Sequence, residues 1–171
     1  MKTARGCFGA EPANDSYTPE ADIRFAISNS SEFNFKMLDF YVLSSKRDMS
    51  KDGLRPRVSL SSPAYWFLHR YFVQADLRPS DYSFLNLFED TELQGYQLHR
   101  FKTELEIARV DLSARSGSVR VLTGWLGDVR SLDAEDWKTV QVEEITQVVS
   151  QLLELVAEAE STNKLLFALG D

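Results

Sequence analysis

The sequence predicts a single α+β domain, in which an antiparallel or mixed sheet of about four strands carries two to three helices packed on one side. Three observations predict this class. Two early segments and one near residue 120 are rich in β-forming residues, with polar and apolar residues in alternation, as in half-buried strands. Two long later segments repeat apolar residues at steps of three and four, which indicates amphipathic helices. The length of 171 residues and the hydrophobic fraction of 43% fit one ordinary globular domain.

The N-terminal part of the chain is expected to supply a lead-in and two strands. Residues 1–20 mix glycine, proline and polar residues without periodicity, so we expect an irregular segment there and a domain over 21–171. Strands are predicted over 22–27 and 36–43, and these two would pair as a hairpin. A long polar loop follows, and it ends in a short strand over 58–60.

Two helices are predicted in the middle of the chain. The first covers 63–75, because proline is tolerated in a first helical turn, and its expected face is Trp66, Phe67, Tyr71 and Phe72. The pattern from Thr91 to Gln94 matches a capping box and predicts the start of the second helix. The apolar stripe of that helix is Leu98, Phe101, Leu105, Ala108 and Leu112.

The last third of the chain is expected to form a strand, a long helix and a terminal element. The strand covers 118–126. The helix runs from Thr139 or Gln141 to Glu160, and Asn163 is its stop. Residues 164–170 form either a final strand or a helical turn. The stripe of the long helix is Val142, Ile145, Val149, Leu152, Val156 and Ala159, widened by Val148 and Leu153.

Charge is the most informative bulk property of this sequence. The formal net charge is −7, and residues 132–171 alone hold nine acids against Lys138 and Lys164. Between Glu143 and Glu160 there are five acids and no base. Such a field repels nucleic acid and attracts basic protein surfaces, so we expect no nucleic-acid partner. One basic loop, with Lys46, Arg47, Lys51, Arg55 and Arg57, reads as a solvated loop.

The motifs of common catalytic and cofactor sites are missing from the sequence. It has no glycine-rich phosphate loop and no nucleophile elbow. The histidines His69 and His99 have no second histidine or cysteine at ligand spacing, so we expect no metal and no cofactor. One cysteine, Cys7, cannot form an internal disulfide, and no stretch approaches the ~18 apolar residues of a membrane span. We therefore expect a bacterial-type cytoplasmic protein that is not an enzyme and has no membrane partner.

These properties favour a small protein-binding module whose acidic face neutralises a basic partner. Its most concrete form is an immunity or inhibitor protein that blocks a basic toxin or effector enzyme. The expected acidic contacts are Asp133, Glu135, Asp136, Glu143, Glu154 and Glu158. The expected aromatic hot spots are Trp66, Trp125 and Trp137.

Two alternatives stay open at this point. One is an enzyme that uses a pair of carboxylates on a small substrate, since twenty-six acids leave room for such a pair. The other is a structural or assembly subunit, a homo-oligomer with Trp125 and Trp137 in its interface.

Overall fold

The computed structural model describes residues 38–50, 53–75, 85, 87, 89–126 and 134–170. The predicted lead-in over 1–20, the predicted strand over 22–27 and the candidate contact Asp133 lie outside these residues. For Trp125 only the backbone is described.

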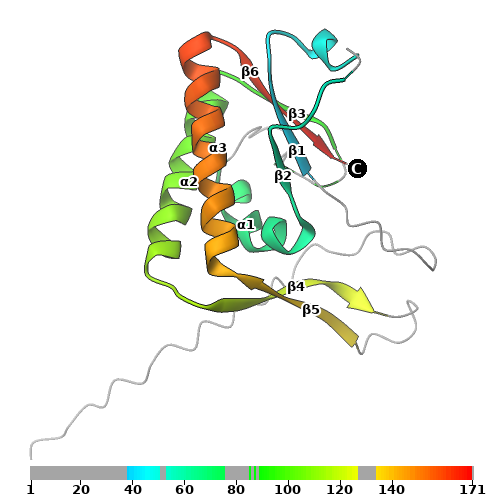
Figure 1. Cartoon of the computed structure of the whole chain (residues 1–171), viewed down its shortest axis with the longest axis vertical. Helices are drawn as coiled ribbons and strands as arrows, with labels where there is room; N and C mark the ends of the chain where they lie inside the picture. Colours follow the sequence, from blue (N-terminus) through cyan, green and yellow to red (C-terminus); the bar gives the residue numbers. More distant parts are fainter. Residues whose placement is uncertain are drawn as a thin grey trace, which may run out of the picture. The chain divides into compact units, whose positions relative to one another are not determined.

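The described chain forms two antiparallel sheets and three α-helices, which confirms the α+β class (Figure 1). The larger sheet has the strand order β2-β1-β6-β3, and β4 and β5 form a separate two-stranded sheet. Helix α3 packs on β1, β2 and β6, while α1 packs against α2 and against β4 and β5. The elements are β1 Leu38–Leu43, η1 Lys46–Ser50, β2 Val58–Leu60, α1 Ser62–Gln74, β3 Thr91–Leu93, α2 Tyr96–Ser113, β4 Ser118–Leu126, β5 Ala134–Gln141, α3 Val142–Thr162 and β6 Leu165–Gly170.

Strand β6 lies in the middle of the larger sheet and settles the open reading of 164–170 in favour of a strand. It pairs with β1 on one side and with β3 on the other. Its apolar run suits this place, because Leu166 and Ala168 enter the main core while Phe167 packs on the opposite face with Tyr41 and Leu43.

Strand β1 confirms the prediction over 36–43 but not the pairing that was expected for it. Over Leu38–Phe40 one edge of β1 bonds to β2 and the other bonds to β6. No edge is free there for a hairpin with 22–27. The chain instead returns to β1 twice, first through β2 after the loop and finally through β6, from more than a hundred residues away.

Helix α1 is confirmed, although the face that it buries differs from the predicted one. Its buried side chains are Ala64, Tyr65, Leu68, Tyr71 and Phe72. Trp66 and Phe67 are only partly buried at the border of the core. The buried face contains Tyr65 and Leu68 in their place, so it is rotated around the helix axis relative to the predicted face.

The stripe of α2 is confirmed, but the predicted capping box is wrong. Thr91 is buried in β3, which bonds to β6, so its side chain does not cap a helix. The helix begins after Gly95, whose φ of 53° is allowed for glycine and strained for other residues. No side chain caps this end of α2. The residues from Thr91 to Leu93 instead form the edge strand of the larger sheet, where they pair with β6.

Helix α3 is confirmed, and all six predicted core residues of its main stripe are buried. Asn163 ends it in the left-handed conformation with φ 51°, and the Lys164 amide donates to the Ala159 carbonyl at 2.9 Å. The start suggested at Thr139 is wrong, because Thr139 belongs to β5, a strand that the sequence did not reveal. Gln141 passes directly from the strand into the helix, and the Val142 amide donates to the Gly117 carbonyl at 2.9 Å.

Strands β4 and β5 form a two-stranded antiparallel sheet, which we call the arm, with one face toward the core and the other toward solvent. Val119, Val121 and Val140 on one face belong to the main core or pack against it. The opposite face carries Arg120 and Trp137, which are exposed. Figure 1 shows this arm below α1, leading directly into α3.

Candidate protein-binding surface

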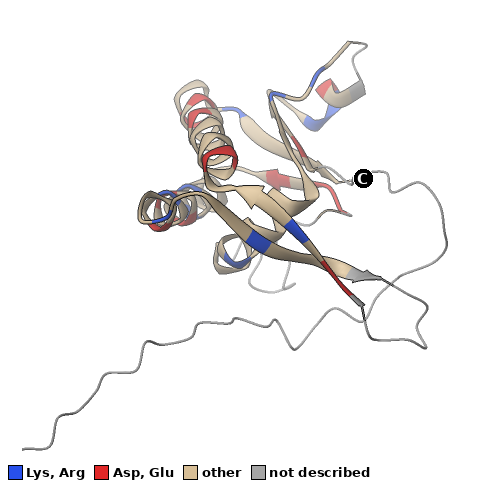
Figure 2. Cartoon of the chain, turned by 60° about the horizontal axis from the view of Figure 1, so that its bottom comes forward, with Lys and Arg blue, Asp and Glu red and all other residues tan. Residues whose placement is uncertain are grey.

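Helix α3 presents an outward face that is acidic and contains no basic residue. Glu143, Glu154 and Glu158 lie on this face, opposite the buried stripe, as the helical spacing predicted. Figure 2 shows α3 with acids only, whereas the neighbouring helix α2 carries both signs. Glu135 and Asp136 lie in β5, which precedes the helix.

Three acids of this region are neutralised by ion pairs, two of them with bases distant in the sequence. Arg57, just before β2, makes a bidentate ion pair with Glu158, with N–O distances of 3.3 and 3.0 Å. Glu160, in the last turn of α3, accepts from the Lys102 ammonium at 2.8 Å, and this hydrogen bond and charge raise the pKa of Lys102. Asp136 pairs with Lys138 at 3.1 Å. The carboxylates of these three acids are therefore engaged in ion pairs within the protein.

The remaining acids have no such neutralisation. Glu143, Glu144 and Glu154 are exposed, and no hydrogen bond or ion pair joins them to any other described residue. Glu144 was not among the predicted contacts, although it shares the outward face. We call the outward side of α3 from Glu143 to Glu154 the acidic face; it also includes Gln147, Ser150 and Gln151, all exposed.

Of the three tryptophans, Trp137 is the one whose indole is shown to be exposed. It is 38% exposed on the outward face of the arm, and its Nε1 donates to the Glu135 carboxylate at 2.6 Å. The Arg120 guanidinium lies over its ring at 5.2 Å from the centroid. The indole is thus held in place by charged neighbours on both strands while its surface stays open.

Trp66 has a packing role instead. Its ring centroid lies 5.2 Å from that of Tyr65 and 5.3 Å from that of His69, within the aromatic side of α1. Burial lowers the pKa of His69, which keeps this imidazole neutral at physiological pH. Trp66, one of the expected hot spots, therefore lies at the border of the core. The side chain of Trp125, another expected hot spot, is not among the described atoms.

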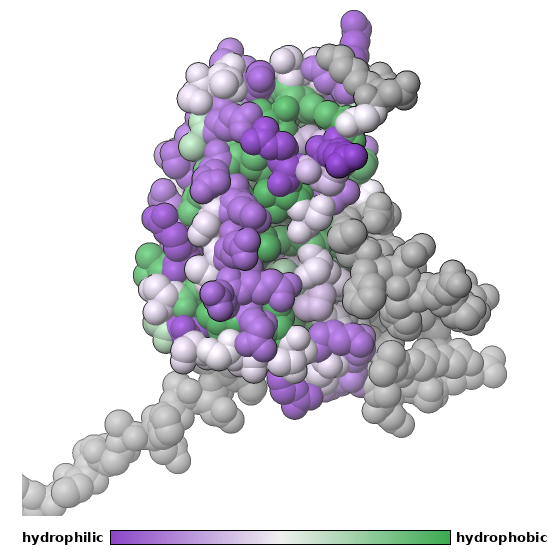
Figure 3. Space-filling view, viewed as in Figure 1, coloured by the Kyte–Doolittle hydropathy of each residue, from purple (hydrophilic) through white to green (hydrophobic). Residues whose placement is uncertain are grey.

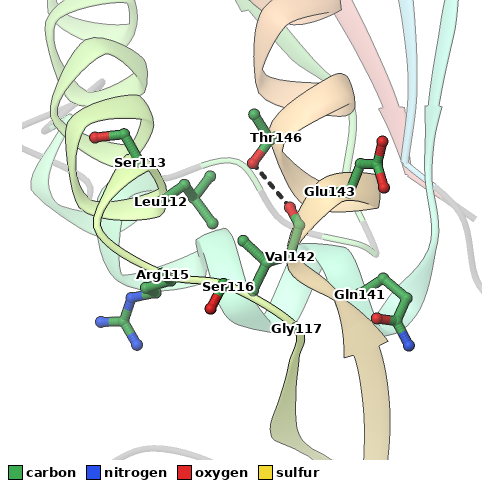
Figure 4. Close-up of a pocket in the computed structure, with 9 residues that line it drawn as sticks. All are labelled: Leu112, Ser113, Arg115, Ser116, Gly117, Gln141, Val142, Glu143 and Thr146. Atoms are coloured by element: carbon green, nitrogen blue, oxygen red, sulfur yellow. Dashed lines mark hydrogen bonds between the residues drawn. The ribbon is translucent and has the colours of Figure 1, made fainter.

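A hollow of about 380 Å³ lies where the arm, α2 and α3 meet (Figure 4). Buried Leu112 and Val142 contribute its apolar part, and Glu143 lies at its rim. The Thr146 hydroxyl donates to the Val142 carbonyl at 2.8 Å, which turns its methyl group and not its oxygen outward from the helix backbone. Because Gln141 and Glu143 both line it, the hollow joins the arm to the acidic face.

The tightest polar cluster in the described chain ties α1 to α2. The Asp111 carboxylate accepts from the Tyr71 hydroxyl at 2.6 Å, from Arg70 at 2.6 Å and from Arg115 at 3.1 Å. Partial desolvation raises the pKa of Asp111, but the hydrogen bonds from Tyr71 and Arg115 and the two guanidinium charges outweigh it and leave that pKa lowered. Burial, together with the bond to Asp111, raises the pKa of Tyr71 to about 12.

Among the described residues, no group of three or more His, Cys, Asp or Glu side chains could hold a metal ion. Within the same residues, no helix is both long enough and apolar enough to cross a membrane. No protein-family model matches the chain, and neither the curated proteins nor the solved structures contain a match to it.

Proposed function

We propose that this chain is a protein-binding module that docks a basic protein surface on the acidic face of α3 and the outward face of the β4–β5 arm. In its most concrete form it is an immunity or inhibitor protein that neutralises a basic toxin or effector enzyme. The observation that carries the proposal is the set of three exposed carboxylates, Glu143, Glu144 and Glu154, that no base of the described chain neutralises.

The contrast within α3 supports a role beyond solubility. Bases are available to this helix, since Arg57 and Lys102 reach its C-terminal end and pair there with Glu158 and Glu160. The other three acids are left open on one side of the same helix. Glu143 and Glu144 in the first turn also favour the helix dipole, but Glu154 lies too far along to gain from it. Open charge of one sign speeds the encounter with a partner of the other sign.

The arm contributes a large exposed aromatic side chain, Trp137, which the acidic face lacks. Charges at an interface steer and select, whereas binding energy concentrates in a few large side chains, with tryptophan prominent among them. Trp137 is exposed and oriented by Glu135 and Arg120, so little side-chain entropy would be lost when a partner covers it. We assign it the anchoring role, and we assign Glu143, Glu144 and Glu154 the steering role.

The test uses a partner captured from the native host and two charge variants with the same change in net charge. Glu143→Lys with Glu154→Lys alters the acidic face, and Glu89→Lys with Asp90→Lys, both exposed and before β3, is the control. The first variant should slow association at least ~10-fold at low salt, and the effect should fade near ~0.5 M salt, where screening lengths shrink to a few ångströms. The control should change the rate much less.

A third variant separates steering from anchoring. Trp137→Ala should raise the dissociation rate and leave the association rate nearly constant, because its contribution is short-ranged. A basic partner that binds the Glu143/Glu154 variant and the control equally fast at low salt would show that the acidic face is only a solubility device.

A further inference from the structure

The outward side of α2 carries an apolar stripe that no described element covers. Tyr96, Ile107 and Val110 are 69%, 49% and 68% exposed, and all three project away from the buried stripe of the same helix. Thr103 lies between them on that side. We call these four residues the α2 stripe. In Figure 3 apolar atoms reach the surface along the left edge, where α2 runs, whereas the front of α3 is hydrophilic.

Helix α1, which packs against α2, also exposes an apolar side chain. Arg70 and Tyr71 bond to Asp111, and the Gln74 carbonyl accepts from Arg100 at 2.9 Å. Val73 lies between these attachment points on α1 and is 42% exposed. Ile107 lies between the corresponding points on α2. The described chain thus exposes four of its six large exposed apolar side chains on α1 and α2.

The charges along the α2 stripe are arranged in a self-complementary way. Arg100 and Glu104, one turn apart, border the edge toward α1, where Arg100 bonds to the Gln74 and Ala75 carbonyls. Lys102 and Glu106, also one turn apart, border the edge toward α3, where Lys102 bonds to Glu160. On each edge the base precedes the acid.

An antiparallel second copy of α2 matches this pattern. A two-fold axis through Thr103 places Tyr96 level with Val110 of the other copy, since each lies seven residues from Thr103. Two-fold pairing also brings each edge against the same edge of the other copy. Arg100 then faces Glu104 and Lys102 faces Glu106, within ~3 Å in height at 1.5 Å per residue. Parallel pairing would instead place Arg100 and Lys102 at the same heights as Arg100 and Lys102 of the other copy.

The charge of the rest of the chain makes α2 the surface best suited to self-association. The chain has a net charge of −7, so two copies repel each other through most faces. Helix α2 is neutral, with Arg100, Lys102 and Arg109 against Glu104, Glu106 and Asp111. A basic heterologous partner would gain nothing from a neutral helix, which argues for a second copy as the occupant.

We infer that this chain forms a homodimer through antiparallel pairing of α2 about Thr103. The inference does not rest on the acidic face, and it differs from an assembly through Trp125 and Trp137. One helix pair with its borders buries less than the ~1,200 Å² of a standard stable interface, so the expected dissociation constant is in the range of ~10–100 µM.

Cross-linking at the axis tests the geometry. Facing helices ~8–10 Å apart with Cα radii of ~2.3 Å put facing Cα atoms ~3.4–5.4 Å apart, and the upper part of this range lies within the ~4.4–6.8 Å that a disulfide spans. In a Cys7→Ser background, Thr103→Cys should oxidise to a covalent dimer. The matched control is Gln151→Cys, exposed on the outward side of α3, and it should cross-link at only the background rate.

Sedimentation equilibrium of the full chain tests the surface itself. The wild-type mass should rise with concentration, and Val110→Asp should hold it at the monomer value with an unchanged melting temperature. Glu104→Lys should weaken the dimer at low salt, because it would face Arg100 of the other copy. A monomeric mass up to ~0.5 mM, about five times the upper end of the expected range of the dissociation constant, would overturn the inference. So would a dimer that Val110→Asp leaves intact, or equal cross-linking of Thr103→Cys and Gln151→Cys.

Discussion

Replacing Leu152 by alanine should be among the most destabilising single truncations in α3. Leu152 is fully buried in the main core, in the middle of the helix that packs on β1, β2 and β6. The change removes three carbon atoms, worth ~2.4 kcal/mol at ~0.8 kcal/mol for each buried methylene. A cavity forms in addition, because α3 is held by strands on one side and by α2 on the other. Together these give an expected loss of ~3–4 kcal/mol.

The neighbouring residue Leu153 supplies a control of identical chemistry. It is only partly buried at the edge of the same core, so Leu153→Ala should cost ~1 kcal/mol. Urea unfolding followed by circular dichroism gives both values, provided that the slope with denaturant stays constant between variants. If Leu152→Ala cost no more than Leu153→Ala, the assignment of α3 as the central core helix would be wrong.

Three further predictions concern metal, backbone space and pH. A chelator should leave the melting temperature unchanged, because the described residues contain no ligand set that would couple metal binding to folding, and a loss reversed by one added metal would contradict this. Gly170→Ala should cost ~2 kcal/mol in the same urea assay, because a Cβ atom there would lie 2.7 Å from the Glu89 amide nitrogen, whereas Gly124→Ala meets nothing within 4 Å and should cost clearly less. Asp111→Asn should destabilise the chain at pH 7, and the difference should shrink as the pH falls through the lowered pKa of Asp111, because such a carboxyl contributes its full stability above its unfolded pKa of ~3.9 and loses it as the folded pKa is crossed. Equal destabilisation at pH 7 and pH 2.5 would contradict this last expectation.

The helices were predictable because each one is specified by its own residues. Apolar residues spaced three and four positions apart correctly predicted the buried stripes of α2 and α3, and Asn163 correctly predicted the end of α3. These signals are local, since a helix bonds within itself and needs from the fold only a surface to cover its apolar side. Some local signals failed: the aromatic spacing placed Trp66 and Phe67 in the buried face of α1, Thr139 was offered as a helix start, and Thr91, read as a helix cap, lies in a sheet instead.

The missed strand β5 shows the limit of this reasoning. Its sequence, AEDWKTVQ, has neither an apolar run nor clear alternation, because one face packs only partly and the other is exposed. Such a strand forms because β4 offers a partner in an antiparallel register from Ser118 to Leu126, which one irregularity between Leu122 and Gly124 interrupts. The pairing of β1 with β6 has the same origin, since it is decided by the whole sheet and not by either segment.

The acidic face shows how a correct charge count can still mislead about a surface. The sequence indicates an unbroken acidic helix, with five acids and no base from Glu143 to Glu160. In the structure the C-terminal end of this helix is neutralised by distant bases, namely Arg57, 101 residues before Glu158, and Lys102, 58 residues before Glu160. What remains open is the earlier stretch, with Glu143, Glu144 and Glu154, where a carboxylate has either water or a partner as its counterpart. Charge along one segment therefore identifies an acidic helix, but only the packing of distant segments shows which of its acids are free to bind.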